Sequence, residues 1–588
     1  MGANTASREE LTGQLHDHSP PFIMSSTLTD WSPALVYVPI GAGIIFVAAH
    51  LVPYFLDPHN YRRPAITGPW LNALSDAWLA HAAAQGDRSE RVHELHKKYG
   101  KFVRIAPNHI SIADPEALHV VYAHGNGTLK TEFYDAFVSI RRGLFNTRDR
   151  AEHTRKRKLV SHVFSQQNVL AFEPHIRRHV RKFCAQWDER CALAAKGENG
   201  PDWEARDGRA WFDCLPHYNY LAFDIIGDLA FGSPFGMIAA QRDSAPMLEH
   251  VEGEDPKSAK RTVKHVPAIK ILNDRGDYAA SLGVMPLWWR PWAKRVPWYA
   301  RGNEAVQCLA GLAVAAVAKR LEEGLPDEEY EEEDGVEQEG PKTKKKRTDL
   351  LEKLLQGKDE TGAPMGREEL TAEALTQLIA GSDTTSNSSC AITYYLATNP
   401  EKQHKLQAEL DEHLSPTTMP TAATSFEKVK SLPYLNACIN EGLRLHATSA
   451  MGLPRVIPPG TTLEVCGEKF GPGSILSVPS FTIHRDQAVW GEDVDAFRPE
   501  RWIEAGVDVQ AGVGTGPMAK AFNPFSYGPR ACVGRNLASM ELQIIISSVF
   551  ARYEFELLKP GESLKTREGF LRKPLSCYVG MRRRTVKS

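Results

Sequence analysis

The sequence predicts a mainly α-helical protein with small β-sheets, preceded by one transmembrane helix. Three observations predict this class. Amphipathic patterns of helical period dominate the 588 residues. Strand-like runs are short, as in FVRIAPNHISIA from Phe102 and again after Leu453. One long stretch near the N-terminus carries no Asp, Glu, Lys or Arg.

The uncharged stretch covers residues 31–56 and follows a polar N-terminal extension, residues 1–30. A helix of about 20 mainly apolar residues crosses a bilayer, so we expect a membrane anchor here. A cleaved signal peptide would begin nearer the N-terminus and be shorter, and a buried core helix is the other alternative. Arg62 and Arg63 follow the stretch, whereas only Arg8 precedes it. The positive-inside rule therefore places the bulk of the chain in the cytosol. Met24 is a second candidate start of translation.

Three further segments complete the expected organisation. Residues 57–67 form a proline-rich linker, which the fixed backbone angle of proline would stiffen. Residues 68–588 form the globular body. Within it, residues 322–347 are an acidic block followed by a basic block with almost no apolar residues, which predicts a disordered surface insert. A nuclear signal in the basic block is the alternative, and a membrane anchor argues against it.

Charge and cysteine usage exclude other classes of protein. The formal net charge is −2, which argues against nucleic acid as a partner. The nine cysteines include no CxxC pair, so their pattern favours free thiols in a reducing compartment over a disulfide framework.

The strongest local signal is FSYGPRACVGRNLA, from Phe525 to Ala538. Glycines flank Cys532, and a helical pattern begins directly after it. Unpaired N–H groups at a helix N-terminus stabilise an anion, so this position favours a thiolate at Cys532. A thiolate in such a setting is a ligand for haem iron, where it pushes electron density onto the metal. A buried cysteine near a glycine turn is the alternative.

This motif resembles the haem-binding signature of the cytochrome P450 family at every fixed position, and further family motifs follow the expected order. The resemblance implies a cytochrome P450 fold, a haem b iron cofactor held by Cys532, and contacts to the haem from Phe525 and Gly534. It also implies a catalytic acid–alcohol pair, Asp383 and Thr384 in AGSDTT, that delivers the protons needed to cleave O₂. Because Ser and Thr hydroxyls bond back to carbonyls, we expect the helix to bend there.

The resemblance implies two more groups of residues. One is a structural lock made by Glu441 and Arg444 of an ExxR sequence with Arg501 of FRPERW, whose disruption would leave a buried charge unpaired. The other binds the haem propionates, because guanidinium groups suit carboxylates; it comprises His153, Arg157, Arg455 and Arg530. On other faces of the His153 helix, Arg155, Lys156 and Lys158 form either a basic docking surface for a reductase or a solvated face.

Stretches such as DIIGDLAFGSPFGM and SVPSFTIHRD resemble, more narrowly, the fungal benzoate 4-hydroxylases. This implies a single-pass protein of the endoplasmic reticulum membrane, in contact with membrane lipid, that hydroxylates a small aromatic acid at the para position. O₂ is the co-substrate, and electrons come from NADPH-cytochrome P450 reductase, because no flavin or nicotinamide fingerprint is present. Lys130, Arg141 and Arg142 are open candidates for the substrate carboxylate. The alternatives are a hydroxylase of another aromatic or polyketide-type metabolite, a haem-thiolate isomerase, and a non-catalytic haem carrier.

Overall fold

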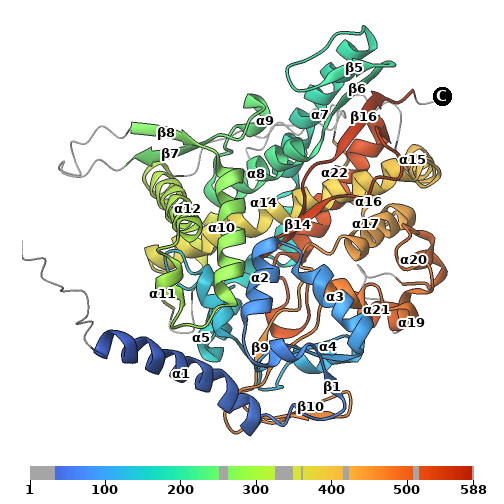
Figure 1. The fold of residues 1–588 in the computed structure, drawn as a ribbon. Coiled ribbons are helices and arrows are strands. Elements are labelled where there is room, and N and C mark those ends of the chain that lie inside the picture. Colours follow the sequence, from blue (N-terminus) through green and yellow to red (C-terminus); the bar gives the residue numbers. More distant parts are fainter. Residues whose placement is uncertain are drawn as a thin grey trace, which may run out of the picture. The chain divides into compact units, whose positions relative to one another are not determined.

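A computed structural model describes residues 33–249, 262–324, 348–358, 362–414, 423–507 and 516–585 (Figure 1). The predicted N-terminal extension lies outside the described residues. So does the predicted charged insert, except for its first residues, since Glu322 and Glu323 end helix α12. The chain divides into two units, Met1–Leu56 and Asp57–Ser588.

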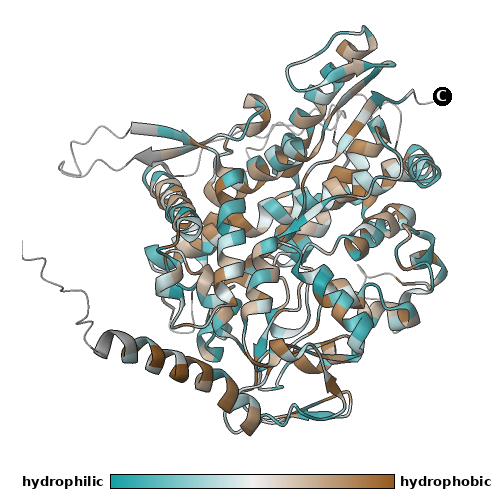
Figure 2. Cartoon of the chain, viewed as in Figure 1, coloured by the Kyte–Doolittle hydropathy of each residue, from teal (hydrophilic) through white to brown (hydrophobic). Residues whose placement is uncertain are grey.

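The first unit contains helix α1, Pro33–Leu56, which agrees with the predicted anchor. Its segment Tyr37–Leu56 is long and apolar enough to cross a membrane, and none of it is buried. Figure 2 shows α1 as mostly hydrophobic along its length. Pro39 and Pro53 lie inside the helix without ending it.

The second unit is mainly helical, as predicted. Its longer helices, apart from α22, which is described with the site below, are α3 (Arg88–Tyr99), α5 (Arg150–Val163), α7 (Glu173–Ala195), α8 (Leu215–Phe231), α10 (Ala268–Gly283), α12 (Pro297–Glu323), α14 (Arg367–Thr398), α15 (Pro400–His413) and α17 (Pro433–Leu445). Helix α14 runs through the interior and packs along α8, α12 and α17 (Figure 1).

A six-stranded sheet lies at one side of this unit, in the order β1-β2-β3-β12-β9-β4. The predicted strands after Phe102 and Leu453 belong to it. Its strands are β1 (Ile66–Thr67), β2 (Phe102–Ala106), β3 (His109–Ile112), β12 (Ile475–Ser477), β9 (Arg455–Val456) and β4 (Leu129–Lys130). The segment expected as a linker therefore contributes a strand, and Tyr61 within it is buried.

The remaining sheets are smaller. One has the order β13-β16-β6-β5. The strands of all these sheets are β5 (Glu204–Arg206), β6 (Arg209–Asp213), β7 (Ala245–Glu249), β8 (Thr262–Val266), β10 (Leu463–Val465), β11 (Glu468–Phe470), β13 (Tyr553–Leu557), β14 (Thr566–Glu568), β15 (Arg572–Pro574) and β16 (Tyr578–Arg583).

Helix α14 is α-helical without interruption from Arg367 to Thr398, so no break separates AGSDTT from the rest of the helix. The physical reason for Gly381 is packing, because a Cβ there would lie 2.8 Å from the side chain of Ile226 in α8. The expected back-bonding of hydroxyls is present. Thr384 Oγ1 donates to the Ala380 carbonyl at 2.6 Å, and Ser382 Oγ to the Leu378 carbonyl at 2.7 Å. These hydrogen bonds are accommodated within regular helix.

Candidate haem-binding and catalytic site

The Cys532 loop is an irregular turn that leads into helix α22, Arg535–Arg552. The Cys532 N–H donates to the Phe525 carbonyl at 2.8 Å, which closes the loop. A short 3₁₀ helix, η3 (Gly528–Arg530), lies between them. Gly528 has φ +71, and a Cβ there would lie 1.8 Å from the Tyr122 carbonyl oxygen, so only glycine fits. The predicted position of Cys532, directly before a helix N-terminus, is confirmed.

Burial and the neighbouring positive groups have opposite effects on the pKa of the Cys532 thiol. Burial raises the pKa of its thiol, and this outweighs the lowering by the Gly534 N–H, Arg157 and Arg535. Cys532 is nevertheless exposed by surface area, so open space borders a thiol that protein otherwise surrounds. The Gly534 N–H at the helix N-terminus therefore favours the thiolate form of Cys532. In the absence of a metal ion, burial has the larger effect on the pKa of the thiol.

Gly534 is the N-cap of α22 and has an ordinary negative φ. The nearest protein atom to a Cβ built there is 3.8 Å away, on Phe164. Protein packing thus gives no reason for glycine at this position. The side chain of Phe525 is partly buried against the hydrophobic core.

A group of buried or half-buried cations surrounds the space beside the loop. Strand β4 pairs with β9 so that Lys130 lies opposite Arg455. Burial lowers the pKa of Lys130 far below its ordinary value, and three neighbouring arginines lower it further. Burial, followed by the charges of Arg530, Lys130, Arg157 and Arg455, lowers the pKa of His153 to about 3. Burial and Arg455 lower the pKa of Arg530 to about 10. The cation cluster comprises Lys130, Arg157, Arg455 and Arg530, together with the neutral imidazole of His153.

The cation cluster lacks a carboxylate partner among the described residues. Arg455 Nη1 donates to Tyr134 Oη at 2.8 Å, and Arg455 Nη2 is buried with no hydrogen-bond partner. Arg157 Nη1 donates to the Ala531 carbonyl at 2.7 Å. The guanidinium of Arg530 donates to backbone carbonyls of the segment before α5. Mutual repulsion and an unpaired buried donor indicate that this site binds an anion.

The Asp383–Thr384 pair lies on the part of α14 that faces open space. Ala380 is exposed and Thr384 is half-buried, although most neighbouring positions of this helix are buried. Asp383 is buried, which raises the pKa of its carboxyl to about 6, with Lys573 opposing the shift. Such a carboxyl exchanges protons near neutral pH.

A side-chain contact joins this part of α14 to the cysteine-loop helix. Thr385 Oγ1 donates to Glu541 Oε2 of α22 at 2.8 Å. Burial raises the pKa of Glu541 to about 7. Sequence analysis did not single out Glu541. Its position within an apolar helical segment could have indicated a buried carboxyl group.

Glu441, Arg444 and Arg501 form one buried network. Arg444 donates to both carboxylate oxygens of Glu441, Nε at 2.9 Å and Nη2 at 2.8 Å. Arg501 Nε donates to Glu441 Oε1 at 3.0 Å. The carboxylate also accepts from Trp502 Nε1 and from the Arg498 backbone N–H, each at 3.0 Å. Arg498 and Trp502, which donate these two hydrogen bonds, lie in FRPERW, the segment in which sequence analysis identified only Arg501.

Only Lys158 of the three basic residues on α5 is fully exposed, so Arg155, Lys156 and Lys158 together form neither a docking surface nor a solvated face. Lys156 is buried, and its ammonium group lies 3.5 Å from Glu369 and donates to the Arg142 carbonyl. Arg155 pairs with Glu152 and Glu369. The reason is tertiary, because the first turn of α14 brings Glu369 to this face of the helix.

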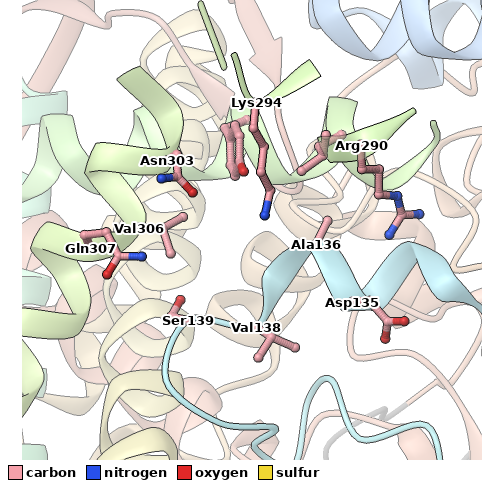
Figure 3. A pocket seen from close by; sticks show the side chains of 11 residues that line it. Asp135, Ala136, Val138, Ser139, Arg290, Lys294, Asn303, Val306 and Gln307 are labelled. Carbon is pink, nitrogen blue, oxygen red and sulfur yellow. The ribbon is translucent and has the colours of Figure 1, made fainter. Parts of the chain in front are cut away.

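Of the three candidates for a substrate carboxylate, Lys130 belongs to the cation cluster. Arg142 instead pairs with Asp135 at 2.6 Å, and Arg141 is exposed. A separate cavity of about 170 Å³ lies between the 3₁₀ helix η2 (Glu132–Phe137), α10 and α12 (Figure 3). Lys294 and Arg290 line it, and Figure 3 shows the Lys294 side chain extending into it.

The family model for cytochrome P450 matches residues 68–581. The chain belongs to the cytochrome P450 family. It is 47% identical to benzoate 4-monooxygenase bphA of Aspergillus niger over 558 residues, 94% of this chain and 99% of that protein. Cytochrome P450 monooxygenase gsfF of Penicillium aethiopicum is 28% identical, over 92% of this chain and 97% of that protein. Pisatin demethylase of Fusarium vanettenii is 26% identical, over 90% of this chain and 89% of that protein.

Membership of this family implies a haem-iron cofactor, a redox partner reductase, O₂ and an organic substrate. The residues present fit a haem. The cation cluster provides the positive charge that two propionates need, including a buried donor without a partner. Cys532 provides a sulfur that borders open space before a helix N-terminus. A Cβ at Gly534, two residues after Cys532, would make only an ordinary van der Waals contact with Phe164 at 3.8 Å, so no protein contact requires glycine there.

Proposed function

We propose that this protein is a membrane-anchored monooxygenase that hydroxylates benzoate at the para position, with haem b ligated by Cys532. The observation that carries the substrate is the 47% identity to a benzoate 4-monooxygenase, which extends over nearly the whole of both chains. When bound, a haem with a thiolate ligand supplies the activation of O₂. The chain's own residues hold the cofactor and control protons.

In this proposal the cation cluster binds the two propionates. Arg157, Arg455 and Arg530 would exchange their carbonyl and hydroxyl partners for carboxylate oxygens, which form stronger, charge-assisted hydrogen bonds. The pKa of neutral His153 would rise towards its ordinary value once the propionates offset the neighbouring cations.

Asp383 and Thr384 are the proposed proton-delivery pair. Burial keeps the pKa of Asp383 near 6, so its carboxyl can take a proton from solvent-linked groups and release it again. The Thr384 hydroxyl is half-buried at the open face of α14 and donates to Ala380 in the absence of another partner. In the working enzyme this hydroxyl would orient a water molecule for proton delivery.

The proposed location is the endoplasmic reticulum membrane, with the catalytic domain in the cytosol and NADPH-cytochrome P450 reductase as electron donor. The helix Tyr37–Leu56 supports a single-pass anchor. The proposed orientation of the chain in the membrane depends on Arg62 and Arg63, the positive charges that follow the helix. Arg63 pairs with Glu468 at 3.1 Å, so it also has a structural role in the body.

The first experiment is a titration of the purified ferric protein with benzoate, followed at the Soret band. A saturable shift from low spin to high spin is expected, because the spin state of the haem would report binding of the substrate next to it. A protein with a normal thiolate spectrum of its reduced CO complex but no shift would remove benzoate and favour another aromatic or polyketide-type substrate. Absence of oxygenation with any aromatic substrate would leave the isomerase or the haem carrier.

Substitution Cys532→Ser tests the ligand assignment. The thiolate Soret signature of the reduced CO complex should be lost, since serine provides no thiolate. Cys466→Ser, on a half-buried cysteine of the β10–β11 hairpin, is the matched control and should keep that signature. A Cys532→Ser protein with an unchanged signature would contradict the assignment.

A further inference from the structure

Three cysteines far apart in the sequence meet in the core. Cys214 is the N-cap of α8, Cys390 lies within α14, and Cys577 directly precedes β16. Their exposed fractions are 0%, 0% and 3%. The three sulfur atoms lie within 4.8 Å of one another, and no other such group of metal-ligating side chains was found among the described residues.

The backbone around this thiol trio, Cys214, Cys390 and Cys577, is fixed by hydrogen bonds. The Cys214 N–H donates to the Cys577 carbonyl at 2.9 Å. The Cys577 N–H donates to Asp213 Oδ1 at 2.8 Å. Cys390 is brought to them by the packing of α14 along α8. The sulfur positions are therefore preorganised by regular structure.

The three thiols also interact with one another. The neighbouring Cys214 and Cys390 thiols lower the pKa of Cys577, against the effect of burial. Burial raises the pKa of Cys214 and Cys390.

We propose that the thiol trio is a binding site for Cu(I), separate from the haem. Three sulfurs placed about 2.3 Å from one central ion would be about 4 Å apart, a triangle that the observed separations allow with small side-chain rotations. All-sulfur ligands select soft ions such as Cu(I). Zn²⁺ in structural sites takes four ligands, and no fourth His, Cys, Asp or Glu joins the group among the described residues.

Binding of the ion requires loss of protons, because thiolates are the ligating form. One thiolate balances the charge of Cu(I), so binding with a single deprotonation leaves no net charge in the core. Binding should therefore release protons and strengthen as the pH rises.

The test uses the full-length holoenzyme without oxygen, with Cu(I) supplied from a chromophoric chelator that competes for it. The wild-type protein should bind one Cu(I), and X-ray absorption should give three sulfur neighbours. Cys577→Ala and Cys390→Ala should each weaken binding at least tenfold. Cys184→Ala is the matched control, a buried cysteine outside the trio, and should bind as the wild type does.

The spectrum of the reduced CO complex reports whether each variant still folds around its haem. If a variant fails to fold, the sulfur count in the wild-type protein still decides. Fewer than three sulfur neighbours, no binding by the wild-type protein, or equal affinity in a folded Cys577→Ala protein would each overturn the proposal. These outcomes do not depend on the substrate or on the ligation of the haem.

Discussion

Glu441→Gln should strongly destabilise the protein, because it removes a buried negative charge from between two arginines. Glutamine keeps the size and shape of the side chain, so the substitution tests the charge by itself. Glu441 and Arg444 are 0% exposed at their side chains, and Arg501 is 5% exposed. The carboxylate accepts five hydrogen bonds, from Arg444 Nε and Nη2, Arg501 Nε, Trp502 Nε1 and the Arg498 backbone N–H. An amide has one acceptor oxygen, so its NH₂ group would face donors.

The expected loss in the free energy of unfolding follows from the arginines, Arg444 and Arg501, that would remain without their negative partner. Removing one partner of a buried ion pair costs about 3–5 kcal/mol, because the remaining charge stays out of water. Arg501 retains Asp493 at 3.2 Å, and Arg444 retains the carbonyls of His484 and Val494, each at 2.7 Å. These contacts limit the loss, so we expect about 3 kcal/mol, the lower end of that range.

Urea denaturation of the detergent-solubilised holoenzyme, followed by tryptophan fluorescence, measures the free energy of unfolding. The matched control is Glu504→Gln, since Glu504 pairs with Arg498 at the surface and is 57% exposed. That variant should change the free energy by less than about 0.5 kcal/mol. A loss below about 1 kcal/mol in Glu441→Gln, or one equal to that of the control, would refute the assignment of this network as a buried electrostatic lock.

Three further changes test other parts of the site. Thr384→Val should lower product formed per NADPH consumed, with a loss of about 10²-fold in hydroxylation rate, and unchanged coupling would contradict its role in proton delivery. Glu541→Gln should leave stability unchanged at pH 4. Because burial raises the pKa of Glu541 from 4.5 to about 7, wild-type stability falls as pH rises through this range. The variant should then be more stable above pH 7, by on the order of 1–3 kcal/mol, and a pH-independent difference would contradict this. Gly528→Ala should impair haem incorporation, because its Cβ would overlap the Tyr122 carbonyl; normal haem content would show that the loop can move.

The sequence alone was sufficient for the features that local chemistry specifies. Residues 31–56 carry no charge, and this composition predicted a long apolar helix, found as Pro33–Leu56. The glycine and cysteine spacing around Cys532 predicted a loop before a helix, and α22 begins at Arg535. The ExxR spacing placed Glu441 and Arg444 on one helix face, where they pair. Each of these signals lies within a few residues of the chain.

Tertiary structure decided which charged side chains are buried and which residues distant in sequence meet. Lys156 was expected at the surface, yet it is buried beside Glu369 of α14, and a charge pattern along one helix cannot report what packs against that helix. Lys130 joins the cation cluster because β4 pairs with β9 and so places it opposite Arg455. Cys214, Cys390 and Cys577 meet only through the packing of α8, α14 and β16. Sequence therefore determined the chemical groups and local elements of this protein, whereas long-range packing determined burial, and burial sets the pKa values and the unpaired donors of its sites.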